Sequence, residues 1–253
     1  GYSLNNFFDS SFYNNLNLNL NNKNSELISG IQFYKIYNSV LSKSETSNYI
    51  KDSIWLDIYN SSFINSDLRQ VYHKSKLVAG VENLPYKKIL EPILGNLLLD
   101  FGGTISSRAT QENRAVFITK LNNKVAPIIC YESMYGEYVT QYVRNGAQFL
   151  AILTNDGWWK NSPGHKQLLS YSKIRAIETR RDIVRSANTG ISAIINKKGD
   201  IVDSLDYKKK GFINSSINLS DKITFYVKYG DFIYRISLFF FLIIVLFYFS
   251  KKK

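Results

Sequence analysis

The stretch Pro127-Ile-Ile-Cys-Tyr-Glu-Ser133 holds the only cysteine of the chain and lies where the sequence pattern changes. Residues 125–130 are apolar enough to form a buried strand. After Cys130 the apolar side chains recur at intervals of three and four residues, which predicts a helix that ends at Gly146. Residues 148–153 again have the pattern of a strand. The sequence therefore predicts a strand, helix and strand unit with the cysteine at its first junction.

Other segments of the chain alternate between strand and helix patterns in the same way. Residues 40–53 are expected to form a polar loop, and residues 85–103 a loop with a short helix. The helix pattern is clear in residues 163–181. Strands are expected at residues 27–34, 58–64, 70–73, 114–119, 183–186, 191–195 and 201–204. This alternation predicts an α/β layered domain.

Composition limits the classes of function that fit the chain. With 253 residues and 45% hydrophobic residues, it is long and apolar enough for one substantial domain. We place this domain at residues 26–230, after an irregular, asparagine-rich segment at 1–25. The net charge of +12 is spread along the chain without a nucleic-acid-binding signature, so an anionic membrane surface is the better partner. One cysteine and two distant histidines cannot form a convincing metal site.

The C-terminal residues 231–253 have the pattern of a membrane anchor. An apolar run from Ile236 to Phe249 is followed by Lys251, Lys252 and Lys253. The alternative is a buried core helix, but no polar stripe interrupts the run. By the positive-inside rule the lysines predict a cytoplasmic C-terminus, with the preceding domain on the other side of the membrane.

Cys130 has two interpretations: a buried structural thiol or a nucleophile. Its expected position at a strand-to-helix junction favours the nucleophile. A thiol with an ordinary pKa of about 8.5 still needs a base or a cation nearby. His73 and His165 stand in no recognisable cysteine-protease motif. Lys74 and Glu82, eight residues apart, form either a solvated charged hairpin or part of a site in which the lysine stabilises an oxyanion.

Four ordered motifs resemble those of the apolipoprotein N-acyltransferases, membrane members of the nitrilase superfamily. They are YHKSKLVAGVENLP (72–85), PIICYES (127–133), LTNDGWWKNSPGHKQ (153–167) and the run from Arg175 to Ile201. The resemblance covers roughly residues 26 to 250 and corresponds to the C-terminal part of such a protein. It implies a nitrilase-like αββα sandwich followed by one C-terminal transmembrane helix.

The resemblance also implies a reaction and its site. Cys130 would accept an acyl chain from a phospholipid as a thioester and pass it to the N-terminal amine of a lipoprotein, without a cofactor. Lys74 and Glu82 would act with the cysteine, supported by Tyr131 and Glu132. Trp158 and Trp159 would form a lipid-facing lid or lie in the core. The full-length protein would be a monomer that spans the bacterial inner membrane several times, with this domain in the periplasm.

Two departures from the family pattern affect this interpretation. Residues 79–81 are Ala-Gly-Val where the family usually has Pro-Phe-Gly, which changes the local loop. The catalytic glutamate of the family has no match, since neither Glu26 nor Glu45 follows an apolar strand ending in Pro-Glu. We therefore expect the general base upstream of Gly1 and no turnover by this chain alone. The alternatives are a nitrilase-type amidohydrolase that uses water and a catalytically inert, membrane-anchored binding domain.

Overall fold

The first of two sheets is formed by the N-terminal third of the chain. The computed structural model describes residues 1–83, 107–159 and 162–251. In this sheet the strand order is β1-β2-β4-β3, with β5 also paired to β4. The strands are β1 (Tyr2–Ser3), β2 (Ile28–Tyr37), β3 (Asn48–Lys51), β4 (Ile54–Asn65) and β5 (Arg69–His73). Alternating apolar residues in β2 and β4 explain their long antiparallel pairing, in which Ile28 lies opposite Ile64.

The second sheet has six strands in the order β11-β10-β9-β8-β7-β6. Its central strands β7, β8 and β9 are parallel, and the outer pairs are antiparallel. The strands are β6 (Phe117–Ile118), β7 (Lys124–Ile129), β8 (Phe149–Thr154), β9 (Ile183–Ala187), β10 (Ser192–Ile195) and β11 (Ile201–Leu205). Parallel central strands have their carboxyl ends at one edge, where ligands of α/β proteins commonly bind.

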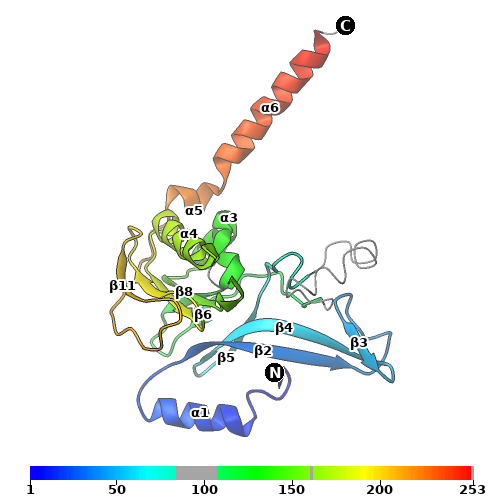
Figure 1. The fold of residues 1–253 in the computed structure, drawn as a ribbon, viewed down its shortest axis with the longest axis vertical. Helices are drawn as coiled ribbons and strands as arrows, with labels where there is room; N and C mark the ends of the chain where they lie inside the picture. Colours follow the sequence, from blue (N-terminus) through cyan, green and yellow to red (C-terminus); the bar gives the residue numbers. More distant parts are fainter. Residues whose placement is uncertain (84–106, 160–161, 252–253) are drawn as a thin grey trace.

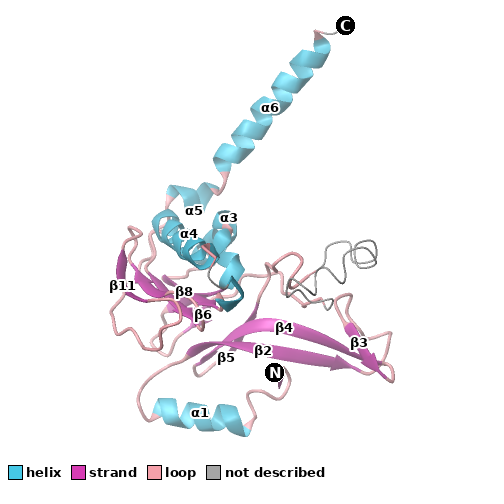
Figure 2. Ribbon diagram, viewed as in Figure 1, coloured by secondary structure: helices cyan, strands magenta, loops and turns pink. Residues whose placement is uncertain are grey.

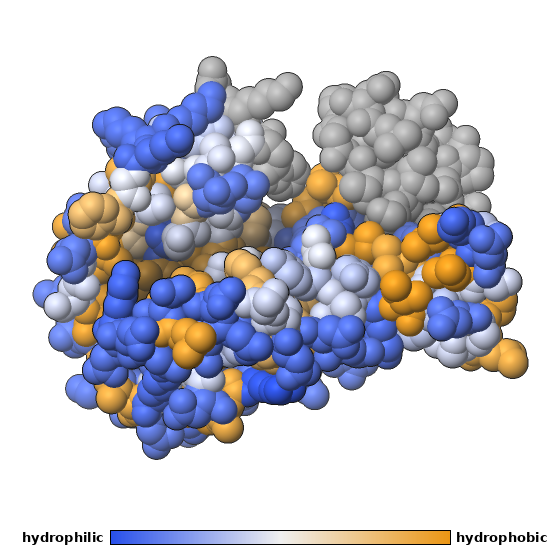
Figure 3. Space-filling model, turned by 90° about the horizontal axis from the view of Figure 1, so that it is seen from below, coloured by the Kyte–Doolittle hydropathy of each residue, from blue (hydrophilic) through white to orange (hydrophobic). Residues whose placement is uncertain are grey.

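Helices cover the outer faces of the two sheets. Helix α1 (Ser11–Asn21) lies on the first sheet, and α3 (Gly136–Arg144) and α4 (Gly164–Thr179) lie on the second (Figures 1 and 2). The predicted α/β fold with an αββα arrangement is confirmed. The face seen from below is mainly hydrophilic, with smaller apolar patches between the polar side chains (Figure 3).

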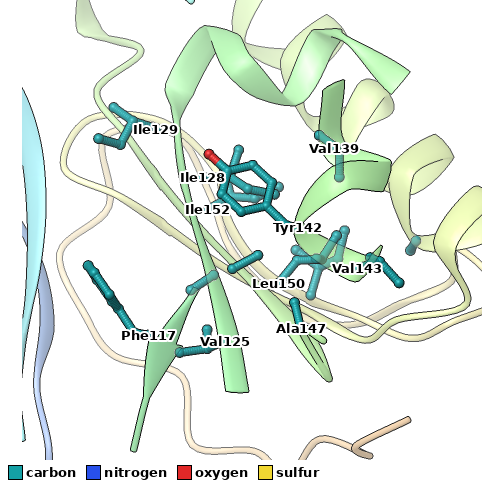
Figure 4. Packing of buried hydrophobic residues seen from close by; sticks show 14 of the residues in the cluster. Phe117, Val125, Ile128, Ile129, Val139, Tyr142, Val143, Ala147, Leu150 and Ile152 are labelled. Carbon is teal, nitrogen blue, oxygen red and sulfur yellow. The ribbon is translucent and has the colours of Figure 1, made fainter. Parts of the chain in front are cut away.

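The main core forms where helix α3 packs on strands β7 and β8. Ile128, Leu150 and Ile152 of the strands are fully buried. Tyr142 and Val139 of α3 belong to the same apolar cluster (Figure 4). Burying each such side chain contributes about 1.5–3 kcal/mol relative to leaving it exposed. This packing fixes the strand that ends at Cys130. A smaller cluster under α1 contains Phe7, Tyr13, Phe33 and Phe63.

Most strands and helices lie where the sequence predicts them. The segment at 1–25, which was expected to be irregular, contains β1 and α1, and there are two further differences. The predicted polar loop at 40–53 contains strand β3, which pairs with the edge of β4. A short 3-10 helix, η1 (Cys130–Met134), begins at Cys130 and precedes α3, so the α-helix begins six residues later than the cysteine. The predicted loop and short helix at 85–103 lie outside the described residues.

The C-terminal helix α6 (Phe232–Ser250) projects from the body as a separate rod, directly after the short helix α5 (Phe225–Tyr229) (Figure 1). Its mean hydropathy is 2.4, and none of its residues is buried by the described part of the chain. It is therefore long and apolar enough to cross a membrane. The alternative of a buried core helix is wrong for this structure.

Candidate active site

A cavity of about 1030 Å³ opens at the carboxyl ends of β7, β8 and β9 and reaches across to the first sheet. The second sheet side contributes Cys130 after β7, Thr154 and Asn155 at the end of β8, and Ser186 to Thr189 at the end of β9. The first sheet contributes residues 27–32 of the β2 region and Asn60 of β4. Lys74 and Glu82 line the same cavity. The predicted cysteine, lysine and glutamate are thus brought together, although up to 56 positions separate them in the sequence.

Cys130 lies at a sharp turn directly after β7. Its φ of +50° is in the left-handed region, which non-glycine residues rarely adopt. Such backbone conformations occur often at functional sites. The thiol is free and only partly buried, and it lies against the main core. The predicted turn is present, but the 3-10 helix η1 occupies the position expected for the N-terminus of an α-helix.

Lys74 is held in one position by Glu82. Its Nζ lies 2.6 Å from Oε2 of Glu82, and the lysine side chain is only 2% exposed. The same carboxylate accepts a hydrogen bond of 2.9 Å from the backbone N–H of Val78, and Asn60 donates its side-chain amide to the other oxygen. A buried ammonium with one oriented partner is a fixed positive charge on the cavity wall. The alternative of a solvated charged hairpin is wrong for this pair.

Glu132, the predicted supporting residue, is not among the described residues that line the cavity. It is fully buried, and its oxygens accept hydrogen bonds from the hydroxyls of Tyr72 and Tyr138 and the backbone N–H groups of Ser75 and Ile129. Burial raises the pKa of Glu132, and these donors act against that shift. The carboxylate therefore ties the segment after Lys74 to the turn that contains Cys130.

A second buried ion pair lies directly next to residues that line the cavity. Arg185 of β9 and Asp156, which follows β8, are joined by a contact of 2.6 Å with both side chains fully buried. Thr154 donates a hydrogen bond of 2.6 Å to the same aspartate. Burial lowers the pKa of Arg185, while the charges of Asp156 and Cys130 oppose the shift. The ion pair therefore joins β9 to the segment after β8, both of which contribute residues to the cavity.

The two histidines lie outside the direct chemistry of this cavity. His73 is on β5, where its Nδ1 contacts the Ser61 hydroxyl at 2.6 Å, and burial lowers its pKa to about 4. His165 near the start of α4 is buried and stacks on the ring of Tyr207 at 4.3 Å. His165 is therefore a core side chain and not a surface residue.

The remaining predicted residues flank the site. The half-buried ring of Tyr131 packs edge-on against Tyr135, 5.4 Å away, and is not among the described residues that line the cavity. Trp158 and Trp159 belong to the 3-10 helix η2 (Gly157–Trp159). The ring of Trp159 packs against Gly164 at the start of α4, and the side chain of Trp158 lies outside the described part of the chain.

Sequence reasoning missed several residues that shape the site. Asn60 holds Glu82, Tyr72 and Tyr138 hold Glu132, and Asp156 neutralises Arg185. Asp156 occurs in the motif LTNDGWW, so a signal for it was present, whereas the charge of Arg185 already suggested a structural ion pair, which the structure shows. Asn60 lies in an ordinary alternating strand, where no local pattern distinguishes it.

One known protein family and its members resemble this chain over most of its length. The profile of the carbon-nitrogen hydrolase family matches residues 34–224. A Chlorobaculum tepidum protein named apolipoprotein N-acyltransferase is 33% identical over 67% of this chain and 32% of its own length. A Wigglesworthia glossinidia brevipalpis protein with the same name is 30% identical over 91% of this chain and 43% of its own length. The chain thus spans less than half the length of these curated relatives.

Among solved structures, a carbon-nitrogen hydrolase from Helicobacter pylori G27 has a similar fold. The TM-score is 0.53 at 13% sequence identity, over 81% of this chain and 68% of that one. At this identity the similarity concerns the fold alone.

Proposed function

Because the chain belongs to the carbon-nitrogen hydrolase family, we propose that it carries the thioester-forming domain of an apolipoprotein N-acyltransferase. The reaction moves an acyl chain from a phospholipid to the N-terminal α-amine of a diacylglyceryl-cysteine lipoprotein. The observation that carries this proposal is that Cys130, Lys74 and Glu82 line the same cavity.

The first half of the reaction forms the thioester. The Cys130 thiolate attacks the ester carbonyl of the phospholipid, and the Lys74 ammonium stabilises the resulting oxyanion. Collapse of this intermediate breaks the carbon–oxygen bond of the ester, and the lysophospholipid leaves with the proton taken from the thiol. Glu82 orients the lysine through its charge-assisted hydrogen bond.

The second half consumes the thioester. The lipoprotein amine attacks the thioester carbonyl, the carbon–sulfur bond breaks, and the thiolate of Cys130 is regenerated as the amine loses a proton to the general base. The products are the N-acylated lipoprotein and the free enzyme. No oxidant, metal or cofactor is needed to balance either step.

We propose that the general base is a carboxylate on a segment that precedes Gly1. Strand β1 runs parallel to β2, with Tyr2 opposite Phe33. In a parallel pair, residues before Tyr2 lie beside the β2 residues before Phe33. Gly1 is already next to Gln32, and residues 27–32 line the cavity. A chain that continues upstream would run along the cavity wall, which supports this placement.

We propose that α6 anchors this domain to the bacterial inner membrane. Its 19 residues extend about 28 Å at 1.5 Å per residue, close to the hydrocarbon thickness of a bilayer. The lysines at 251–253 favour a cytoplasmic C-terminus, with the catalytic domain in the periplasm and further spans upstream. A lipid substrate and a lipoprotein N-terminus both meet the domain at this surface. The proposed unit is a monomer, and Trp158 and Trp159 remain proposed parts of a lipid-facing lid.

An amidohydrolase that resolves the thioester with water is the second candidate, since the matching family profile is that of carbon-nitrogen hydrolases. In that case the cysteine would release ammonia from small amides. The two candidates share the first covalent step and differ in the acceptor.

The test uses the full-length protein in membranes with a phospholipid whose acyl chain is radiolabelled. We expect a hydroxylamine-sensitive label on the wild type and none on Cys130→Ala, while both proteins stay in the membrane fraction. A lipoprotein peptide with a free N-terminus should discharge the label by forming an amide. Equal labelling of the alanine variant would contradict the assignment of Cys130, and ammonia release without peptide acylation would favour the hydrolase.

A further inference from the structure

A second cavity, of about 380 Å³, lies beside the N-terminal end of α3, where α5 leads into α6. Its basic residues are Lys76, Arg114 and Arg144, and its acidic residues are Glu137 and Asp231. Figure 1 shows this part of the molecule at the point where α6 leaves the body. In the described chain, this cavity and the Cys130 cavity share no lining residue. It is therefore a separate site.

The three basic side chains keep further donors for a ligand. Arg114 already donates a hydrogen bond to the backbone oxygen of Glu112, and Arg144 donates one to the hydroxyl of Thr140. None of them forms an ion pair within the described residues. Lys76 Nζ lies over the ring of Tyr138 at 5.8 Å, and the guanidinium of Arg114 lies over the same ring at 4.2 Å. The Nε of Arg114 is buried without a hydrogen-bond partner in the described chain.

The two carboxylates of the cavity are already engaged. Glu137 accepts a hydrogen bond from Arg235 in the first turn of α6 and one from the backbone N–H of Asp231. Asp231 accepts a hydrogen bond of 2.5 Å from the hydroxyl of Tyr226. The carboxylates therefore fasten α6 to the body, and the unpaired charge that remains in the cavity is positive.

The position of the cavity indicates where its ligand comes from. Asp231 is the residue immediately before α6, so a membrane-spanning α6 puts the cavity next to the bilayer surface. The headgroup layer adds about 5–7 Å on each side of the hydrocarbon core. Arg144 and Lys76 would thus lie at the depth of lipid phosphates. This step rests on the proposed membrane insertion of α6 and is independent of the acyl-transfer chemistry.

We propose that this cavity binds the phosphate of a phospholipid headgroup. Guanidinium groups bind phosphate oxygens through paired, charge-assisted hydrogen bonds, and a lysine adds a point charge. The volume is near the lower end of the range for small-ligand sites, which suits a headgroup better than a whole lipid. A lipid held here would sit on the membrane side of the domain, bound by its headgroup instead of its ester.

The test measures lipid retained by the 253-residue chain. The protein is reconstituted in nanodiscs with equal amounts of dioleoyl phosphatidylglycerol and dioleoylglycerol, extracted into mild detergent, and analysed by native mass spectrometry. We expect retention of the phosphate-bearing lipid over dioleoylglycerol, which has the same chains. The double variant Lys76→Gln/Arg144→Gln should reduce this retention roughly tenfold.

A matched control removes the same charge elsewhere. Lys197→Gln/Lys198→Gln changes two exposed lysines in the turn between β10 and β11 and should retain lipid like the wild type. Cys130→Ala should also retain it, because this inference does not require the thioester. Flotation of each variant with vesicles verifies that α6 inserts.

Three outcomes would overturn the proposal. Equal loss in both double variants would mean that net charge alone attracts the lipid. Equal retention of dioleoylglycerol would mean that the chains are recognised instead of the phosphate. If inorganic phosphate binds the detergent-solubilised protein and displaces the lipid at millimolar concentration, the site belongs to a soluble anion.

Discussion

The Nζ of Lys74 and the Oε2 of Glu82 lie 2.6 Å apart in a place where water reaches little of either side chain. A buried ion pair of this kind often contributes little net stability, because both ions lose their hydration. Breaking one half of it is costly. The pair is therefore better explained by the need for a fixed charge at the cavity than by stability.

This explanation predicts that substitutions of Lys74 and Glu82 do not have additive effects on the free energy of unfolding. Glu82→Met leaves the buried lysine without its partner and should lower the free energy of unfolding by about 3–5 kcal/mol. The double variant Lys74→Met/Glu82→Met should be more stable than that single variant and fail to form a thioester. Urea denaturation in detergent measures the first effect and labelled lipid the second. Additive losses of stability would contradict a coupled pair.

Asn60 should affect the rate of the first step. Its amide donates to Glu82, which in turn holds Lys74, so Asn60→Ala should slow thioester formation roughly tenfold by loosening the ammonium. The matched control is Ser62→Ala on the same strand. The Ser62 hydroxyl is buried and has no hydrogen-bond partner among the described residues, so its loss should leave the rate unchanged. Rapid-quench labelling measures the rate of thioester formation in each variant. Equal rates for both variants would refute the role of Asn60.

His73 predicts a pH dependence of stability. Burial lowers its pKa to about 4 from an unfolded value of about 6.5. The folded state therefore binds fewer protons, and the stability that neutral His73 contributes is complete above pH 6.5 and lost as the pH falls toward 4. The full change is at most roughly 3 kcal/mol. The difference between wild type and His73→Gln should shrink over this window in thermal or urea unfolding, whereas parallel curves would contradict the prediction.

The stability of the fold should depend on the carboxylate of Glu132, even when it is replaced by the amide of the same shape. Glu132→Gln replaces one acceptor oxygen with an NH₂ group, which would face a donor such as the Ile129 N–H or the Tyr72 hydroxyl. We expect a loss of about 1–3 kcal/mol in the free energy of unfolding. The exposed Glu112→Gln should change stability by less than about 0.5 kcal/mol. A loss no larger than that of the control would show that the buried network does not depend on the carboxylate.

The sequence was sufficient to predict the strands around Cys130 because continuous apolar runs form them and a period of three to four follows the cysteine. It did not predict η1, since a five-residue 3-10 helix is too short to establish a period. The positive φ of Cys130 was also not predictable, because cysteine does not favour that conformation and the surrounding structure imposes it.

The site was predictable only where motif and chemistry coincided. Lys74, Glu82 and Cys130 could be identified because they lie in motifs that resemble one family. The inward orientation of Glu132 depends on Tyr72, 60 positions away, and on the packing of α3, so no local pattern encodes it. Strand β3 was missed for a similar reason, since its polar residues pair only because the edge of β4 is available.

The joint between α5 and α6 has a mechanical consequence. Gly230 has a φ of +61°, and a β-carbon there would come within 2.7 Å of the Glu137 carboxyl, while Arg235 is bound to the same carboxylate. Because α6 is fastened to the domain in its first turn, we expect its orientation relative to the domain to be fixed and not variable, as it would be with a flexible linker. If α6 spans a bilayer, its fixed orientation would set the height and tilt of the Cys130 cavity above the membrane. An ester at one depth in the bilayer would then reach the Cys130 sulfur more readily than an ester a few ångströms deeper.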